Sequence, residues 1–149
     1  MADQVPIPML RKLNARDGHH CIMTATESDR LVPQHRQGGM GGRRNKHRLA
    51  NLLWLDSIAN GLIESDPRLQ AVAKAWGVKV SLHANVEEIP VFRPHMGQWF
   101  RLVGETRIPI TALEALDRMH AFYGDEYFAW KAAADRSVHE VALAARGVR

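Results

Sequence analysis

Five stretches of the chain place apolar residues at three- and four-residue steps and carry terminal signals typical of helices. Asp66 is a capping residue followed by Pro67, which suits the first position of a helix. Thr111 and Glu114 have the spacing of a capping box. The pattern therefore predicts helices over 9–17, 57–65, 66–76, 111–123 and 125–145.

Short apolar runs between polar, glycine or proline positions predict strands. From Val78 to Leu82 apolar and polar residues alternate, as in a strand that is buried on one face. The predicted strands are 19–23, 30–33, 78–82, 89–92 and 99–103, and the last two flank a turn at 94–97. Together with the helices, these strands indicate an α+β fold.

The segment from Arg30 to Asn51 differs from the rest of the chain in charge and composition. Between Arg30 and Ala50 lie six Lys or Arg residues and no Asp or Glu, whereas the remainder carries 14 cations and 16 anions. Four glycines, Gly38, Gly39, Gly41 and Gly42, let the backbone approach a ligand closely. A loop of this kind is typical of contact with a polyanion, and the alternative interpretation is a solvated basic surface.

Length and composition narrow the class of protein. A chain of 149 residues favours one domain with an appended subdomain and can bury a hydrophobic core. The apolar runs are far shorter than a membrane span, and the first residues lack the basic start and apolar stretch of a secretory signal. One cysteine excludes an internal disulfide and suits a reducing compartment. We therefore expect a cytoplasmic protein without membrane contact.

The order of parts in this segment resembles the HNH nuclease family, also called the ββα-metal fold. The resemblance lies in His35, the Gly-Gly that follows it, and Asn51-Leu52 before a closing helix. It is closest to small HNH-like proteins of phages that infect actinobacteria. The shared parts read His35-Arg36, Gly39-Met40-Gly41-Gly42, Gly77-Val78 and Ile89-Pro90-Val91.

The similarity covers roughly residues 14 to 104. It implies an HNH-like ββα core with a small antiparallel strand pair over residues 1–104, followed by a helical C-terminal extension over 105–149.

The resemblance also implies a site. In the family a histidine deprotonates water while a divalent cation stabilises the leaving oxygen. The matching positions are His35 for the base, Asn51 for the residue that orients the loop, and Gln34, Asn60 and Glu64 for the metal ligands. The spacing of four puts Asn60 and Glu64 on one helix face. One carboxylate and two amides should hold Mg²⁺ or Mn²⁺ poorly, so we expect no cofactor unless the protein is an active nuclease.

Many relatives carry a structural zinc held by two CxxC pairs. The corresponding positions here read Cys21-Ile-Met-Thr24 and Asp56-Ser-Ile-Ala59, so three of the four sulfur ligands are missing. We therefore expect no structural zinc. The C-terminal helices could replace its stabilisation by burying additional apolar area.

These features favour a protein that binds nucleic acid, with double-stranded DNA as the expected partner, and whose cleavage activity is weakened or lost. The residues expected to contact phosphates are Arg36, Arg43, Arg44, Lys46 and Arg48. One alternative is an active metal-dependent endonuclease. Another is a phage protein that binds a host protein, or a second copy of itself, through its C-terminal helices. The aromatic residues from Phe122 to Trp130 are expected to pack between helices or else to form that interface.

Overall fold

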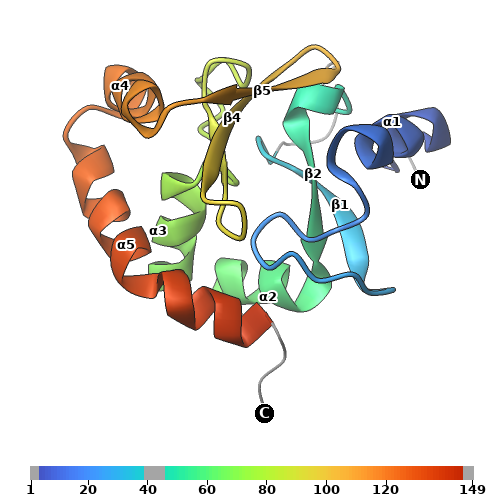
Figure 1. Cartoon of the computed structure of the whole chain (residues 1–149), viewed down its shortest axis with the longest axis horizontal. Coiled ribbons are helices and arrows are strands. Elements are labelled where there is room, and N and C mark those ends of the chain that lie inside the picture. The colour runs from blue at the N-terminus through green and yellow to red at the C-terminus, as the bar shows by residue number, and fades with distance from the viewer. Residues whose placement is uncertain (1–3, 39–45, 146–149) are drawn as a thin grey trace.

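The computed structural model describes residues 4–38 and 46–145, with side chains as far as residue 137. Those residues form an α+β fold (Figure 1). The helices are α1 (Ile7–Asp17), α2 (Ser57–Ser65), α3 (Pro67–Ala75), α4 (Ala112–Tyr123) and α5 (Glu126–Ala145). The strands are β1 (Leu31–His35), β2 (Leu52–Asp56), β3 (Val91–Arg93), β4 (Gln98–Val103) and β5 (Thr106–Ile110). Among the described residues, no helix is both long enough and apolar enough to cross a membrane.

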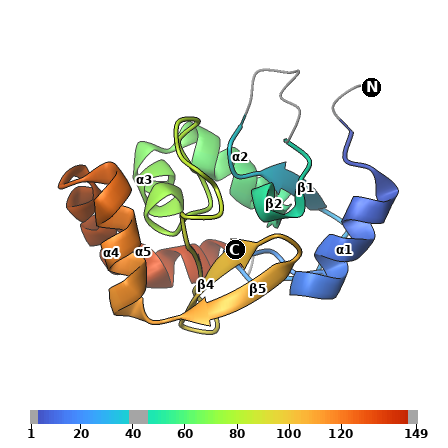
Figure 2. The same ribbon diagram turned by 90° about the horizontal axis from the view of Figure 1, so that it is seen from above.

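The smaller sheet is an antiparallel hairpin of β1 and β2. His35 lies opposite Leu52 at the end where the long connection leaves, and Leu31 lies opposite Asp56 at the other end. Helix α2 begins at the residue after β2, so strand, strand and helix follow one another in what we call the ββα unit. The larger sheet has the order β3-β4-β5. Figure 2 shows the β1–β2 and β4–β5 hairpins as separate groups, with α1 on one side of the molecule and α4 and α5 on the other.

The prediction of a strand over 19–23 is wrong, and the second strand of the hairpin is β2. Residues 22–24 form a turn, in which the backbone N–H of Ile22 donates to the carbonyl oxygen of Trp54 at 2.9 Å. All five residues of β2 are buried, so this strand lacks the alternation by which a half-buried strand is recognised in a sequence.

The prediction of a strand over 78–82 is also wrong. The backbone N–H of Val80 donates to the carbonyl oxygen of Arg36, and the side-chain amide of Gln37 donates to Ser81. Val78 and Val80 are buried, which explains their alternation without a sheet. The sequence pattern did not predict β5, whose residues are mostly exposed and include Pro109, a residue tolerated mainly at sheet edges.

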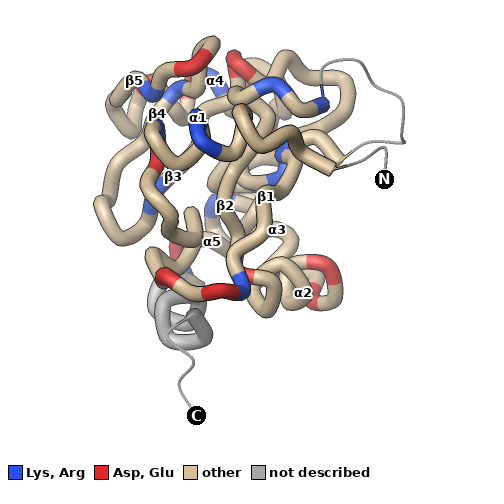
Figure 3. Tube along the Cα trace, turned by 90° about the vertical axis from the view of Figure 1, so that its right-hand side faces the viewer, with Lys and Arg blue, Asp and Glu red and all other residues tan. Residues whose placement is uncertain are grey.

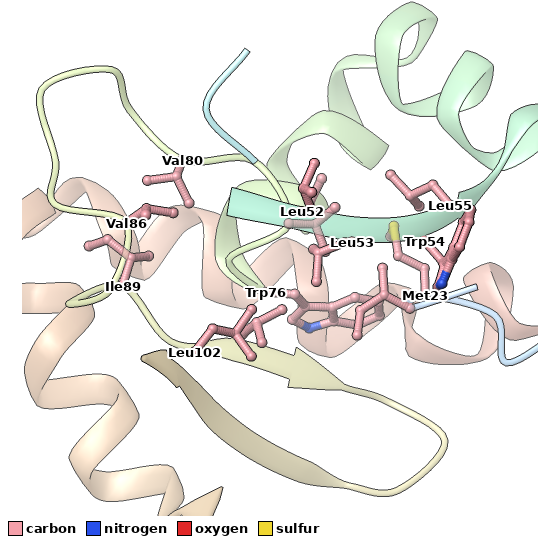
Figure 4. Packing of buried hydrophobic residues seen from close by; sticks show 14 of the residues in the cluster. Met23, Leu52, Leu53, Trp54, Leu55, Trp76, Val80, Val86, Ile89 and Leu102 are labelled. Atoms are coloured by element: carbon pink, nitrogen blue, oxygen red, sulfur yellow. The ribbon is translucent and has the colours of Figure 1, made fainter. Parts of the chain in front are cut away.

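One hydrophobic core extends through both the ββα unit and the C-terminal helices. Figure 4 shows the Trp76 side chain near Leu53 of β2 and Leu102 of β4. Met119 of α4 and Tyr127 of α5 belong to the same buried cluster. A boundary after residue 104 would fall in the turn between β4 and β5 and separate two hydrogen-bonded strands.

Local interactions position the ends of the helices as the sequence predicts. The side chains of Asp66 and Thr111 accept hydrogen bonds from backbone N–H groups in the first turns of α3 and α4. Gly77 follows α3 with φ of +71°. A Cβ atom there would lie 1.8 Å from the carbonyl oxygen of Pro90, so only glycine lets the end of α3 approach the start of β3.

Candidate functional site

Asn51 joins the two ends of the long connection between β1 and β2. Its side-chain oxygen accepts from the backbone N–H of Gln37 at 2.8 Å, and its amide nitrogen donates to the carbonyl oxygen of Lys46 at 2.9 Å. The Asn51 backbone oxygen also accepts from the N–H of Arg36 at 2.7 Å. Because Asn51 is buried, these bonds are shielded from competing water. The residue therefore holds the start and the end of the glycine-rich loop together.

Arg36 cannot serve as a phosphate contact, which corrects the expectation from the sequence. The side chain is 1% exposed, and its guanidinium donates to backbone carbonyl oxygens of five residues. These acceptors belong to Ala50, Gly77, Val86, Ile89 and Pro90. Burial lowers the pKa of Arg36 to about 9, which still leaves the guanidinium charged at neutral pH. The residue therefore ties β1 to the chain that connects α3 with β3.

The expected base and the three expected metal ligands line one cavity of about 840 Å³. Gln34 and His35 reach it from β1, and Asn60 and Glu64 reach it from α2. Asn60 and Glu64 share a helix face, as their spacing predicts. The antiparallel pairing of β1 with β2, followed at once by α2, is what brings residues 25 or more positions apart to the same cavity.

The His35 ring contacts a second imidazole. Its Nε2 atom lies 3.0 Å from Nδ1 of His47, and the two ring centroids are 5.0 Å apart. In the neutral pair one nitrogen donates and the other accepts, so each ring constrains the tautomer of the other. His47 lies at the far end of the loop that Asn51 closes, and no sequence spacing rule connects it with His35.

The residues at the expected metal positions do not fit Mg²⁺ or Mn²⁺ well. Glu64 supplies the one carboxylate, and its Oε1 atom is 2.5 Å from Nζ of Lys79. Within the described residues, no three His, Cys, Asp or Glu side chains are grouped as metal ligands. Gln34 and Asn60 add only neutral amide oxygens, whereas these hard cations prefer carboxylates. The Lys79 ammonium would compete with a metal for the carboxylate of Glu64.

Comparison with family models, with curated proteins and with solved structures finds no match to this chain. The geometry of the site is therefore the basis for interpreting it.

The basic residues of the loop fall into two groups. Arg43 and Arg44 lie outside the described residues. Lys46 and Arg48 are partly exposed on the segment that returns to β2. Figure 3 shows Lys and Arg positions beside the loop and Asp and Glu positions on α2. Lys46 and Arg48 thus lie next to the end of the loop.

The positions that correspond to zinc ligands in the family have other roles in this chain. Cys21 is fully buried in the turn beside β2. Asp56 caps α2 by accepting from the N–H of Ile58 at 2.9 Å, and it also accepts from Ser28 and Arg30. Burial raises the pKa of Asp56. Hydrogen bonds from Arg30, Ile58 and Ser28 lower the pKa by more than burial raises it, so the net shift is downward.

Part of the cavity comes from outside the ββα unit and was not predicted from the sequence. Lys74, Lys79 and His83 line it, as do Phe122, Tyr123 and Trp130 from the C-terminal helices. The sequence carries a signal for these helices but none for the surface on which they pack. The amphipathic pattern therefore predicts that the aromatic side chains pack between elements. It does not indicate that they line the same cavity as His35.

Proposed function

We propose that the protein binds nucleic acid, double-stranded DNA foremost, through a ββα unit descended from HNH nucleases, with cleavage weakened or lost. One observation carries the proposal. Gln34, His35, Asn60 and Glu64, which the resemblance matched to a base and three metal ligands, line a single cavity. The order of β1, β2 and α2 brings these four positions together, and this is the arrangement that the resemblance implies. The bonds of Asn51 to both ends of the loop add support, since the resemblance assigns that residue to loop positioning.

The chemistry of the ligand set favours binding over cleavage. Hydrolysis of a phosphodiester by this kind of site depends on a divalent cation that neutralises charge on the leaving oxygen. Here the only carboxylate at the expected metal positions forms a close ion pair with Lys79. We therefore propose no metal-dependent cleavage step.

The proposed contact surface is the glycine-rich loop with Arg43, Arg44, Lys46 and Arg48. Arg36 is removed from this set because its guanidinium is buried. Because Asn51 holds the two ends of the loop together, several of its cations could contact the same phosphate backbone at once. Such contacts position a protein on nucleic acid without reading its sequence.

Binding measured across a range of salt concentrations tests this surface. The logarithm of the association constant for a short duplex should fall linearly with the logarithm of the salt concentration. Arg43→Ala with Arg44→Ala should weaken binding to unrelated duplexes about equally. In the same double variant, the plot of log association constant against log salt concentration should become less steep, by about 0.9 for each phosphate that the loop no longer neutralises.

A double variant with the same charge change at Lys131 and Arg136 of α5 provides the matched control and should bind as the wild type does. If the loop variant also binds as the wild type does, the loop is only a solvated surface.

The second candidate, an active endonuclease, is favoured by the contact of His35 with His47. A general base needs a defined orientation, and the hydrogen bond to a second imidazole 3.0 Å away restrains the His35 ring and couples its tautomer to that of His47. Gln34→Asp with Asn60→His would restore the ligands usual in the family. A gain of plasmid nicking in that variant, abolished again when His35→Ala is added, would show that the unit retains a competent base.

A further inference from the structure

The cavity in front of His35 has a second wall built by the C-terminal helices. Phe122 and Tyr123 of α4 and Trp130 of α5 line it, and we call these three side chains the aromatic wall. The same cavity is lined by Gln34 and His35. Groups that the resemblance links to phosphodiester chemistry therefore share one space with three aromatic rings.

Contacts with the rest of the fold hold the aromatic wall in place. The Tyr123 hydroxyl accepts from the backbone N–H of Ser81 at 3.1 Å. The Tyr123 ring meets the rings of Phe122 and Trp130 edge to face, each at a centroid distance of 4.8 Å. The buried Tyr127 hydroxyl donates to the carbonyl oxygen of Ala75 at 2.8 Å and fixes α5 against α3. The wall is thus a preorganised surface.

Packing between helices does not account for Phe122. Its side chain is 42% exposed although it lines the cavity, whereas Tyr127 four residues beyond Tyr123 is 1% exposed. A cavity of about 840 Å³ is far larger than one aromatic ring needs. It falls within the range of roughly 300–1,000 Å³ typical of ligand sites, which usually combine apolar walls with a few polar groups.

The charged groups of the cavity suit a ligand with an aromatic ring and a phosphate. Lys74 places its ammonium 5.3 Å from the centre of the Trp130 ring. Lys79 also lines the cavity but forms an ion pair with Glu64. Glu64 and Glu126 contribute negative charge. Bases stack on aromatic side chains whatever their sequence, while Lys side chains contact the backbone.

We propose that this cavity accepts an unstacked base of a nucleic acid strand, with the base against Phe122 and its phosphate near Lys74. This inference rests on the proposed function and narrows its substrate class. Bases in an intact duplex are stacked and cannot reach a cavity wall, whereas bases in single strands or bulges can. Within double-stranded DNA, the preferred binding site is therefore one that contains at least one unpaired base.

Binding to three matched oligonucleotides tests the proposal. They are a fully paired duplex, the same duplex with one bulged 2-aminopurine, and the single strand that contains 2-aminopurine. The wild type should bind the bulged duplex more tightly than the paired duplex. It should quench the 2-aminopurine fluorescence of the bulged duplex and of the single strand by stacking.

Phe122→Ala should weaken binding to the two forms with an unpaired base by roughly 5- to 150-fold, remove the quenching, and leave paired-duplex binding unchanged. Phe122→Tyr should restore tight binding and quenching because it keeps the ring. Phe128→Ala is the matched control, since Phe128 is a similarly exposed aromatic residue at 48% that does not line the cavity. Both alanine variants should stay folded and lose a similar, small amount of stability, because each removes one aromatic contact.

The outcomes separate this inference from the proposed function. If Phe122→Ala weakens no binding, or weakens all three oligonucleotides equally, the cavity does not hold a base although the protein still binds nucleic acid. If the wild type binds none of the three, the proposed function fails and the inference fails with it.

Discussion

At the scale of single residues, charge alone does not predict where a side chain lies. Arg36 and Arg48 are both cations of the same basic segment, yet Arg36 is buried among carbonyl oxygens and Arg48 is partly exposed. The sequence contains no signal for this difference, because the five acceptors come from distant segments whose position depends on the whole fold. The role that the resemblance assigns to Asn51 stays a prediction, and the structure shows the two backbone groups that its side chain binds.

Replacing Arg36 by lysine should therefore destabilise the protein although the charge is kept. An ammonium group has three donors and cannot serve five carbonyl oxygens, and buried groups without a partner cost about 1–3 kcal/mol each. We expect Arg36→Lys to lower the free energy of unfolding by at least about 2–4 kcal/mol in urea denaturation. Arg11→Lys on the exposed side of α1 is the control and should change it little. Equal stability of the two variants would mean that the guanidinium bonds contribute nothing.

At the scale of elements, the ends of helices were predicted better than buried strands. Helix caps depend on residues a few positions apart in the sequence, so the roles of Asp66, Pro67 and Thr111 can be predicted from it. Strand β2 could not be recognised from alternation because it is buried on both faces. The convergence of β1 and α2 at one cavity depends on β2, and periodicity alone therefore could not predict the site.

Two glycine substitutions test how the elements join. Gly77→Ala should lower the free energy of unfolding by about 3 kcal/mol or more, because φ is +71° and the new Cβ would lie 1.8 Å from the carbonyl oxygen of Pro90. Gly61→Ala in α2 meets no atom within 4 Å and should raise it by about 0.5–1 kcal/mol. Thermal unfolding of both variants measures the difference. A Gly77→Ala protein as stable as the wild type would contradict the close approach of α3 and β3.

The cap of α2 should make stability depend on pH in the acid range. The folded pKa of Asp56 is lowered, so its contribution is present above the unfolded value of about 3.9 and is lost as pH falls through the folded value. Asp56→Asn keeps a capping oxygen but loses the charge that pairs with Arg30, so it should be less stable at neutral pH by about 0.5–1 kcal/mol and should lose less stability on acidification. Urea denaturation from pH 7 to pH 2 measures both effects. Parallel curves for the two proteins would exclude this role.

At the scale of the whole molecule, the C-terminal helices are part of the core and not a separate appendage. Met119, Tyr127 and Ala134 are nearly inaccessible, and the Tyr127 hydroxyl binds α3. The aromatic residues from Phe122 to Trp130 were expected to pack between helices or to form an interface. Tyr127 is buried inside the chain, whereas Phe122 and Phe128 are exposed. A partner that binds these helices would have to use their outer face, where Leu113 and Phe128 are exposed.

Deleting residues 125–149 should therefore abolish cooperative unfolding. The truncated chain would lack Tyr127 and Ala134 of the buried cluster and expose the apolar surface of α3. Near-ultraviolet circular dichroism and urea denaturation detect the change. A truncated protein with unchanged stability and a sharp unfolding transition would show that the ββα unit and the sheet fold without α5.

The most direct measurement of the central claim compares DNA binding and DNA nicking in the same reaction series. Wild-type protein should shift DNA in a gel but should not nick supercoiled plasmid in Mg²⁺ or Mn²⁺, because Glu64 is paired with Lys79 and the remaining ligands are amides. His35→Ala should bind as the wild type does. Wild-type nicking that disappears in His35→Ala would contradict the account, since loss of a positioned general base typically lowers a rate by about 10²–10⁴, and it would establish an endonuclease.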